Sequence, residues 1–391
     1  MIREKNIAYI SKSAIEQNYK TIQDHLQTNQ GNVPQIIATV KANAYGHGVD
    51  IVTEVLGEHG CSFFAVSSEH EAIEVRTLEE KRGRHPRILI LGYTFPENAS
   101  CMAANDIECT AVSPTHAIEL AGAVGQGRLK IHIALDTGMH RIGFACDTPE
   151  LAEQTVNDIA ALAEEPHLHI MGIFSHFACC DDEMLDGLRP VSNERLTELQ
   201  LARYGHVLEL LEARGVSVGL RHIANSAAIL GYMPAWLDAV RAGIILYGLS
   251  PDGKPWQDGA FRPVMALVTT VAHIQTLRPG EHVSYGATYT AETERTIATL
   301  PIGYADGWIR AYNGAAVMLH GKDYPVVGRI CMDQCMIDIT DAKTPVAVGD
   351  PVVLFGNDNG ARLADLAKRA GTIVYECTCH VSHRVPRIPI D

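Results

Sequence analysis

The 391-residue sequence lacks several features that would assign it to common protein classes. It has no cluster of basic residues and a formal net charge of −14, which argues against nucleic acid or acidic lipid as a partner. No run reaches the roughly 18 apolar residues of a membrane span, and the first residues lack the apolar core of a signal peptide. We therefore expect a soluble cytoplasmic protein.

The cysteine spacing also argues against zinc and disulfide frameworks. The sequence has 10 cysteines but no Cys-x-x-Cys pair, and its closest groupings suit shared metal ligation poorly because neighbouring strand residues alternate between faces. In the cytoplasm such cysteines are expected to be free thiols. No metal site is predicted.

What the sequence does contain is a regular series of short apolar runs, and 47% hydrophobic residues can fill the cores of two domains. In the first two thirds these runs alternate with helix-length segments, and several are continuously apolar, as expected of parallel strands buried on both faces. The eight predicted strands are Gln35–Val40, Phe63–Val66, Ile88–Leu91, Glu108–Val112, Ile131–Leu135, Ile170–Phe174, Leu220–Ala224 and Ala239–Leu246.

This alternation predicts an α/β barrel of the (β/α)8, TIM-like type over residues 11–249. An open doubly wound sheet is the alternative, but it favours a Gly-x-Gly-x-x-Gly turn after the first strand, and none is present. The clearest helix is predicted over Asn193–Arg214, where apolar residues recur at helical spacing before Gly215. Ser68 and Glu71 predict a capping box at the start of another helix.

The pattern changes after about Tyr247. Ser250–Pro255 is rich in turn-forming residues and indicates a linker. Residues 250–391 then contain runs bounded by proline and glycine, which predict a mostly antiparallel β domain with one short helix, Leu363–Arg369. Residues 1–10 are compatible with a further strand in this domain or in the barrel.

Polar residues gather where the predicted barrel strands end, which is where barrels carry their active sites. Lys41 follows the first strand, later strand ends bring Arg141, His176 and Ser226, and Arg241 lies on the eighth strand. A partly desolvated lysine can act as a nucleophile or a base, although a lone strand-end lysine is usually solvated. The interpretation as an active site therefore depends on all of these residues lying near the same ends of the predicted strands, and not on Lys41 alone.

The last two strand ends offer a phosphate site. Ser226 has a hydroxyl at a predicted helix start, and Gly243 and Ile244 have backbone amides without a large polar side chain. A plain helix N-cap is the other interpretation of Ser226. A phosphate site opposite Lys41 suggests a phosphorylated carbonyl cofactor, and pyridoxal 5'-phosphate satisfies both requirements through its phosphate and its aldehyde.

Arg241 is the candidate partner for the pyridine nitrogen of such a cofactor. Because a guanidinium keeps its proton, it would donate to an unprotonated nitrogen, and the ring would then stabilise a carbanion only weakly. A ring of this kind suits simple proton removal and return. A structural ion pair inside the barrel is the alternative role for Arg241.

Together these segments resemble one known family. Val40–Gly48 closely resembles the cofactor-lysine motif of bacterial alanine racemases. The resemblance continues in family order along nearly the whole chain. Its further segments are Asp136–Gly143, Ser175–Phe177, Ala224–Ala228, Arg241–Ile244, Val283–Tyr289, Pro301–Gly307, Gly328–Gln334 and Tyr375–Arg387.

The resemblance implies a pyridoxal-phosphate enzyme that interconverts L- and D-alanine for peptidoglycan, built as a head-to-tail homodimer with shared active sites. It implies that Lys41 binds the cofactor and is one base, and that Tyr285, contributed by the other subunit, is the base on the opposite face. Arg141 and Met332 would bind the substrate carboxylate. The cofactor-binding residues would be Lys41, Tyr45, Arg141, His176, Ser226, Arg241, Gly243, Ile244 and Tyr375.

Two acid/base groups on opposite faces suit racemisation, because a proton leaves one face of Cα and returns to the other. A tyrosine is a poor base near neutral pH, so His176 and Arg241 are implied as groups that lower the pKa of Tyr285. The resemblance also implies a polar ring at the outer entrance, formed by Asp181, His222, Tyr304, Arg310 and Arg329.

The sequence departs from the family pattern near Arg141. Ala134 stands where many members have a carbamylated lysine that orients this arginine, and His140 stands where glycine is common. These departures bear on substrate preference and rate. Two alternatives stay open: a racemase of broader specificity, acting on serine or other amino acids, and a non-catalytic pyridoxal-phosphate-binding protein. Decarboxylases of this fold would need a carboxylate in place of Arg241.

Overall fold

The computed structural model describes residues 4–28, 33–180, 193–253, 259–356 and 361–391. The chain forms two compact units that do not follow sequence order. One unit holds residues 19–44 and 53–246, and the other holds residues 1–18, 45–52 and 247–391. Helices α1 (Lys12–Leu26), α2 (Lys41–Tyr45) and α3 (Val49–Glu58) contribute residues to both.

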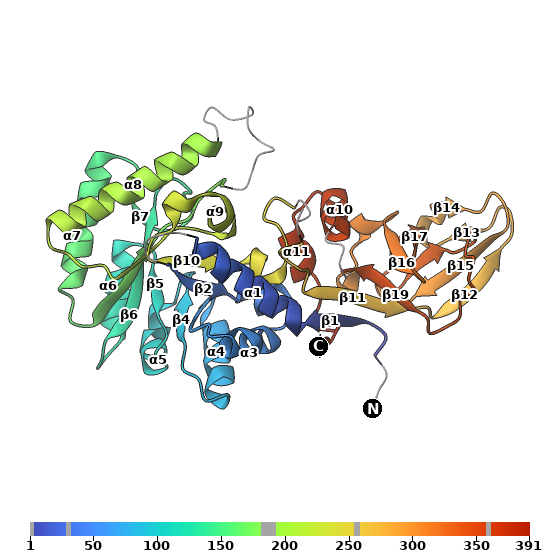
Figure 1. The fold of residues 1–391 in the computed structure, drawn as a ribbon, viewed down its shortest axis with the longest axis horizontal. Coiled ribbons are helices and arrows are strands. Elements are labelled where there is room, and N and C mark those ends of the chain that lie inside the picture. The colour runs from blue at the N-terminus through green and yellow to red at the C-terminus, as the bar shows by residue number, and fades with distance from the viewer. Residues whose placement is uncertain (1–3, 29–32, 181–192, 254–258, 357–360) are drawn as a thin grey trace. The chain divides into compact units, whose positions relative to one another are not determined.

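The first unit is a barrel of parallel strands (Figure 1). The strands follow one another in the order β4-β3-β2-β10-β9-β8-β6-β5, and a parallel bridge between Leu89 and Glu108 joins the two ends of this order. The predicted barrel is therefore confirmed, and the open doubly wound sheet is wrong. The strands are β2 (Gln35–Thr39), β3 (Phe63–Val66), β4 (Arg87–Ile90), β5 (Cys109–Ala111), β6 (Leu129–Asp136), β8 (Leu168–Phe174), β9 (Leu220–His222) and β10 (Ala239–Ala242), with the short β7 (Phe144–Ala145) beside β6.

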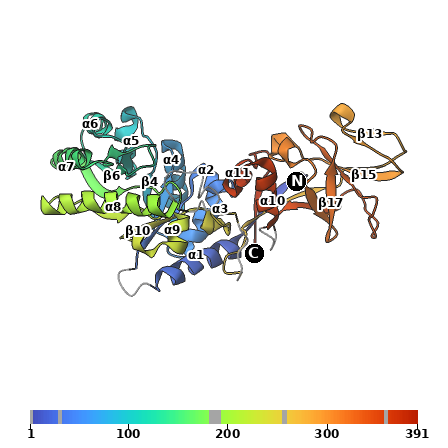
Figure 2. The ribbon, with the colours of Figure 1, turned by 90° about the horizontal axis from the view of Figure 1, so that it is seen from above.

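Helices lie on the outside of these strands (Figure 2). Several begin at side-chain caps: the hydroxyls of Ser68, Ser113 and Thr148 each accept from a backbone amide of the first turn, which satisfies a donor that the helix itself cannot pair. The helices are α4 (Glu69–Lys81), α5 (Ala99–Ala104), α6 (Pro114–Ala123), α7 (Pro149–Ala163), α8 (Asn193–Ala213) and α9 (Ser226–Gly231).

The buried face of α8 differs from the predicted apolar stripe. Leu199 belongs to that stripe but is 41% exposed, whereas Thr197 and Gln200 are buried. The reason is chemical: the Gln200 amide donates to the carbonyl of His176 at 2.9 Å and to Thr137 Oγ1 at 3.2 Å. A polar side chain faces inward here because the barrel loops supply its partners.

The second unit is built around a sheet in the order β12-β15-β18-β17-β16-β19-β11-β1-β20. All neighbouring pairs are antiparallel except β1 with β20, so the predicted mostly antiparallel domain is confirmed. The strand near the N-terminus pairs with β11 and β20, in this unit. The strands are β1 (Ile7–Ser11), β11 (Met265–Thr270), β12 (His273–Leu277), β15 (Arg295–Leu300), β16 (Ala316–Leu319), β17 (Lys322–Val327), β18 (Cys335–Asp338), β19 (Pro351–Phe355) and β20 (Arg387–Ile390), with a separate hairpin of β13 (His282–Val283) and β14 (Tyr289–Thr290).

Two helices complete this unit. The first, α10 (Ala361–Ala370), covers the predicted helix, and the second, α11 (Val374–Cys379), was not predicted. The predicted linker Ser250–Pro255 lies partly outside the described residues. Within the described parts of the chain, no helix combines the length and the apolar character needed to cross a bilayer.

Candidate active site

Lys41 begins a left-handed turn directly after β2. Its neighbour Val40 is buried, and Lys41 itself is half-buried. Ala42, Asn43 and Ala44 have φ between 53° and 54°, and Tyr45 continues at 53°. Left-handed backbone costs about 1–2 kcal/mol for each residue that is not glycine. Strain of this kind is characteristic of functional sites, and other contacts must hold it in place.

Glu71 holds the start of this turn. One of its carboxylate oxygens accepts from the Ala42 amide at 2.7 Å, and the other accepts from the Ser67 amide at 2.7 Å. The capping box predicted at Ser68 is therefore only half correct: Ser68 caps α4, but Glu71 bonds to the two loops instead of returning to the Ser68 amide. Bonds to a carboxylate are stronger than neutral ones, so Glu71 stabilises the strained turn.

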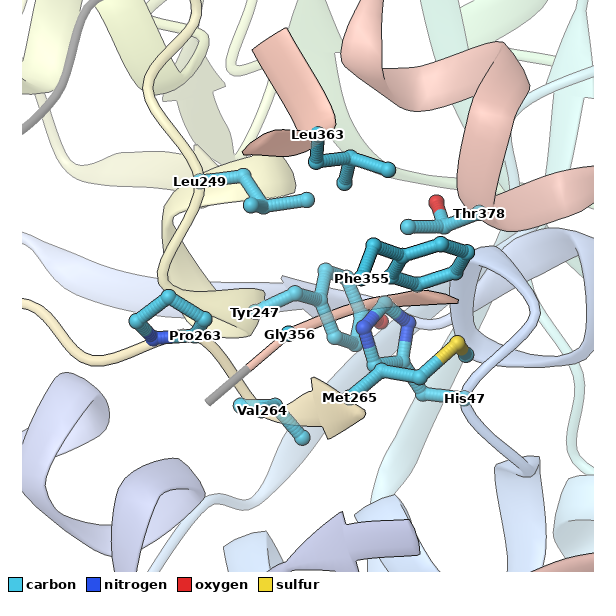
Figure 3. Close-up of a pocket in the computed structure, with 10 residues that line it drawn as sticks. All are labelled: His47, Tyr247, Leu249, Pro263, Val264, Met265, Phe355, Gly356, Leu363 and Thr378. Atoms are coloured by element: carbon cyan, nitrogen blue, oxygen red, sulfur yellow. The ribbon is translucent and has the colours of Figure 1, made fainter. Parts of the chain in front are cut away.

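The residues that follow the turn pack within the second unit. Tyr45 is buried between Tyr247 and Tyr375, with ring centroids 5.0 and 6.0 Å apart, and burial raises the pKa of its hydroxyl. Figure 3 shows His47 against the Tyr247 ring, at a centroid distance of 4.4 Å. Gly46 has φ +83°, and a Cβ there would lie 2.2 Å from the carbonyl oxygen of Thr378, so only glycine fits.

Arg241 is buried inside the barrel, on β10. Its Nη1 donates to His222 Nδ1 at 2.7 Å, and its Nη2 donates to the Ser175 carbonyl at 2.7 Å and to His176 Nδ1 at 3.1 Å. Further bonds reach the carbonyls of His222 and Ile223. The described partners are carbonyls and histidines, so the ion pair considered from the sequence is not formed among them. Burial lowers the pKa of Arg241 to about 10, and the group stays charged at neutral pH.

His176 is kept neutral by burial and by three neighbouring cations. Burial is the main cause of a pKa well below the usual 6.5, and the positive charges of Arg241, Arg141 and Lys41 lower it further. The ring is therefore neutral. Because its Nδ1 accepts from Arg241, its proton is on Nε2, which can donate to a group in the site.

Ser226 joins the loops after β9 and β10. The helix cap of α9 is Asn225, whose side chain accepts from the Ala228 amide, so the N-cap interpretation of Ser226 is wrong. The Ser226 hydroxyl instead accepts from the Gly243 amide at 3.0 Å. A hydroxyl can accept and donate together, so Ser226 keeps a proton to donate to an anion. Gly243 and Ile244 are buried beside it.

Arg141 is exposed and follows a turn organised by Asp136. The Asp136 carboxylate accepts from the amides of Gly138 and His140 at 3.0 and 2.9 Å. His140 has φ 56°, a conformation that glycine adopts without strain, which explains why glycine is common at this position and leaves the histidine here strained. Arg141, Ala134 and others line a cavity of about 20 Å³, which has room for about one water molecule.

Tyr285 stands on a strained turn of the second unit, in η5 (Tyr285–Ala287). Ser284 has φ 66° and ψ −178°, a region that is almost restricted to glycine. The Ser284 hydroxyl donates to the Arg329 carbonyl at 2.6 Å. Tyr285 itself is 71% exposed, so the ordinary role of a packed strand tyrosine does not apply.

Other exposed groups lie on neighbouring loops, one of which contacts the Tyr285 turn through Cys331 Sγ, 3.4 Å from Ser284 Oγ. Met332 is 53% exposed and Tyr304 is 41% exposed. The amides of Tyr304 and Ala305 donate to the carbonyls of Cys331 and Met332, which keeps these two loops together. This part of the second unit therefore presents a tyrosine base candidate beside apolar and cationic side chains that a single chain leaves uncovered.

The implied entrance ring requires a correction. His222 is 0% exposed and is bonded to Arg241 inside the barrel, so it does not line an entrance. Tyr304, Arg310 and Arg329 are exposed in the second unit, and Asp181 lies outside the described residues. The sequence patterns did not indicate the role of Glu71 at the Lys41 turn, nor any role for His132 and Glu108. A charged or imidazole side chain within an apolar strand pattern is the signal that would have found the last two.

The fold and this site define a class: a barrel enzyme with a basic pocket at the carboxyl ends of its strands and a second, antiparallel domain. The N-terminal domain of the alanine racemase family matches residues 10–251, and the C-terminal domain of that family matches residues 264–389. The chain is 41% identical to the alanine racemase of Clostridium novyi, over 92% of this chain and 90% of the relative. It is 38% identical to that of Methanococcus maripaludis over 97% of both chains.

Solved structures agree with these relatives. The alanine racemase of Clostridium difficile 630 superposes with a TM-score of 0.89 at 34% identity, covering 100% of this chain and 97% of that one. The Bacillus anthracis alanine racemase, solved with bound L-Ala-P, has a TM-score of 0.87 at 32% identity and covers 100% and 96%. The chain belongs to the alanine racemase family and is an enzyme of the isomerase class.

Proposed function

We propose that this chain binds pyridoxal 5'-phosphate in its barrel and interconverts L- and D-alanine, supplying D-alanine for peptidoglycan. The relatives named above support the reaction and the substrate. When bound, the cofactor makes the Cα proton of an amino acid acidic by drawing electrons into its ring. The residues of this chain must then hold the cofactor, orient the substrate and move a proton between two faces.

The donor set suits this cofactor. Lys41 offers an amine to the aldehyde, and the Ser226 hydroxyl and the Ile244 backbone amide offer donors for a phosphate. The Gly243 amide donates to the Ser226 oxygen and so holds that hydroxyl in place. We propose that the hydroxyls of Tyr45 and Tyr375 complete the phosphate site. Their rings pack together at 6.0 Å, which fixes their relative orientation.

The observation that carries the proposal is the environment of Arg241. Its two Nη groups are fully engaged by carbonyls and histidines, and its Nε–H has no partner among the described residues. It can therefore donate to a ring nitrogen that stays unprotonated, because arginine does not release its proton. That favours racemisation over reactions that need a stronger electron sink, such as decarboxylation.

Two groups move the proton in this proposal. The Lys41 amine takes or returns it on one face of Cα, and the Tyr285 hydroxyl of the other subunit acts on the opposite face. His176 has Nε2–H available as a donor that would stabilise the tyrosinate, which lowers the pKa of a tyrosine. The exposure of Tyr285 on its own chain supports a homodimer in which each site is shared.

Substrate selection is assigned to Arg141, Met332 and Tyr375. The Arg141 guanidinium would pair with the substrate carboxylate and with the phenolic oxygen of the cofactor, and the Met332 amide would meet the same carboxylate. The Tyr375 ring would limit the side-chain pocket to about a methyl group. Discrimination in such a pocket reaches only about 1–3 kcal/mol, so serine is expected to react slowly.

The test is Lys41→Ala. The wild type should show the visible absorption of a lysine-bound pyridoxal phosphate and should form D-alanine from L-alanine. Lys41→Ala should lose both, while the exposed Lys81→Ala should keep both. A wild type without the visible band would overturn the cofactor assignment. Equal rates with serine and alanine would favour the racemase of broader specificity.

Three further assignments belong to this proposal. The barrel domain is taken as residues 11–249 and the β domain as 250–391, with residues 1–10 added to the β domain because β1 pairs with β11 and β20. The cytoplasmic location remains a prediction, which cell fractionation would test. The homodimer is tested by sedimentation.

A further inference from the structure

A continuous line of polar side chains runs through the barrel from the buried Arg241 to the half-buried Arg87. His222 Nε2 lies 2.9 Å from His132 Nδ1, and His132 Nε2 lies 2.7 Å from the Glu108 carboxylate. Arg87 closes the line with bonds of 2.6 and 2.8 Å to the same carboxylate. His222 and His132 are 0% exposed and Glu108 is 1% exposed, so water does not supply their partners.

The donors and acceptors along this line allow one arrangement. Arginine only donates, so His222 Nδ1 must accept from Arg241, and the proton of a neutral His222 is then on Nε2. That proton points to His132 Nδ1, which must accept, so the proton of His132 is also on Nε2. It points in turn to Glu108, which accepts because it is ionised. The three bonds from Arg241 to Glu108 therefore run in one direction, and Arg87 donates to the same carboxylate from the other side.

The charges agree with this assignment. Burial raises the pKa of Glu108, but hydrogen bonds from His132 and Arg87 outweigh it and lower the value to about 2. Burial and the Arg241 charge hold the pKa of His222 well below 6.5. Burial also lowers the pKa of His132. Arg87 Nη2 lies 3.5 Å from His132 Nε2, a much longer contact than the 2.7 Å from the same nitrogen to Glu108, so the His132 proton is assigned to the Glu108 bond.

A path for protons into the active site is not the function of this line. A proton relay must both receive and pass on a proton at each end, and Arg241 releases none at neutral pH. The line instead behaves as a fixed chain of dipoles. It gives Arg241 a strong acceptor while the nearest carboxylate in the line stays two imidazole rings away.

Neighbouring residues are shaped to hold the two rings. A Cβ at Gly172 would lie 2.4 Å from two ring atoms of His132, so glycine makes the space for that ring. Phe174 stacks on His222 with an interplanar angle of 12°, and the Arg241 guanidinium lies 5.3 Å from the Phe174 centroid. The Phe63 ring similarly lies 4.2 Å from the Arg87 guanidinium. The line is thus packed as well as bonded.

We propose that Glu108, His132 and His222 are positioning residues that fix the direction of the hydrogen bonds at Arg241 and so determine how it meets the ring nitrogen of the cofactor. With Nη1 and Nη2 held, the guanidinium cannot rotate to present a different edge. The part of this inference that concerns the ring nitrogen rests on the proposed function. The direction of the hydrogen bonds through His222, His132 and Glu108 does not depend on the proposed function.

The direct test is the position of the protons on the two histidines in the wild-type holoenzyme, by neutron diffraction. Deuterium on Nε2 of both His132 and His222, with none on Nδ1, is expected. Deuterium on His222 Nδ1, or on both nitrogens of His132, would overturn the proposal.

A variant pair tests the effect on the cofactor. His222→Phe keeps a ring on Phe174 and the backbone carbonyl bonded to Arg241, but it removes the imidazole acceptor. We expect cofactor affinity to fall about tenfold because one buried N–H of Arg241 loses its partner. His116→Phe is the control, since His116 is also a buried histidine but lies on the outer helix α6, where its ring bonds to the Val112 amide and the Thr94 carbonyl. Cofactor affinity of His116→Phe should stay within about twofold of wild type, even if both variants melt earlier.

Two further measurements separate positioning from general damage. Glu108→Gln keeps an acceptor oxygen for His132, so its cofactor affinity should lie closer to wild type than that of His222→Phe. The KM for alanine should change less than the cofactor affinity in His222→Phe. Equal loss of cofactor in His222→Phe and His116→Phe would contradict the proposal. Absence of cofactor in the wild type would instead contradict the proposed function, and the neutron result would still decide the directed line.

Discussion

The two residues proposed as bases stand on turns that are similarly strained and differently supported. In the Lys41 turn, Ala42 to Tyr45 have φ of 53° or 54°, and the Ala42 amide is bonded to Glu71. In the Tyr285 turn, Ser284 has φ 66° and its hydroxyl is bonded to the Arg329 carbonyl. Lys41 is half-buried, whereas Tyr285 is 71% exposed.

This difference separates two ways of preparing a catalytic group. The electrostatic surroundings of Lys41, including His176 and Arg241, are completed within one chain. The backbone at Tyr285 is also strained, but among the described residues of its own chain the ring has no comparable surroundings. A strained turn that holds an exposed ring in a fixed position suggests that another subunit covers the ring. For this reason we expect an active site shared between subunits.

The largest effect is expected from removing the Tyr285 hydroxyl. Tyr285→Phe should lower racemisation about 10³-fold, since a positioned acid or base contributes about 10²–10⁴-fold. The cofactor should stay bound and the melting temperature unchanged, because the ring is exposed. Tyr93→Phe, at a 44% exposed tyrosine of the barrel, is the control. If Tyr285→Phe kept its racemase activity, Tyr285 would not be a base and its comparison with Lys41 would have no basis.

The second effect concerns the close contact that follows the Lys41 turn. Gly46→Ala should destabilise the fold by about 1–3 kcal/mol, since its Cβ would collide with the Thr378 carbonyl. Gly60→Ala is a matched control: Gly60 has φ +85°, nearly that of Gly46, with nothing within 4 Å of the added carbon. The difference between their unfolding free energies isolates the collision from backbone strain. Equal values would show that the Gly46 contact is unimportant.

The third prediction tests the support of the Lys41 turn. Glu71→Ala should cost about 1–3 kcal/mol in unfolding free energy, because two backbone amides lose a charged acceptor. Cofactor affinity should fall with it if the turn positions Lys41. Glu74→Ala, at an exposed glutamate on the same helix, should change neither quantity. Thermal melts and cofactor titration would measure both, and unchanged affinity in Glu71→Ala would argue against a positioning role.

The smallest effect is expected at the less supported turn. Ser284→Ala removes the bond to the Arg329 carbonyl and should cost about 1 kcal/mol in unfolding free energy. The turnover number should nevertheless fall several-fold, because the loss acts on the position of Tyr285. An unchanged turnover number would mean that the partner subunit, rather than Ser284, sets the conformation of this turn.

The sequence predicted the structure well where a regular pattern of apolar residues is followed by a residue with a distinct chemical role. Buried parallel strands are continuously apolar, so the barrel and the placement of Lys41 and Arg241 at strand ends could be predicted. The left-handed turn could not, because residues 42–45 include no glycine to signal positive φ. The buried face of α8 was misjudged for a related reason: Gln200 faces inward only because loops distant in sequence supply its partners.

His222 shows the limit of carrying roles over by resemblance. A histidine at a strand end is compatible with an entrance and with a core, and only the hydrogen bonds to Arg241 and His132 distinguish them. These bonds join residues that are 19 and 90 positions apart in the sequence. Local sequence patterns carry no information at that range.

The central claim is that Lys41 and Tyr285 in one active site come from different chains, and mixed dimers test it most directly. Lys41→Ala and Tyr285→Phe chains would each be inactive alone. If sites are shared, a mixed dimer has one site with both native residues, so equal mixing of chains by coexpression should restore about a quarter of wild-type activity. If mixed dimers form and no activity returns, both residues belong to the same chain and the account is wrong.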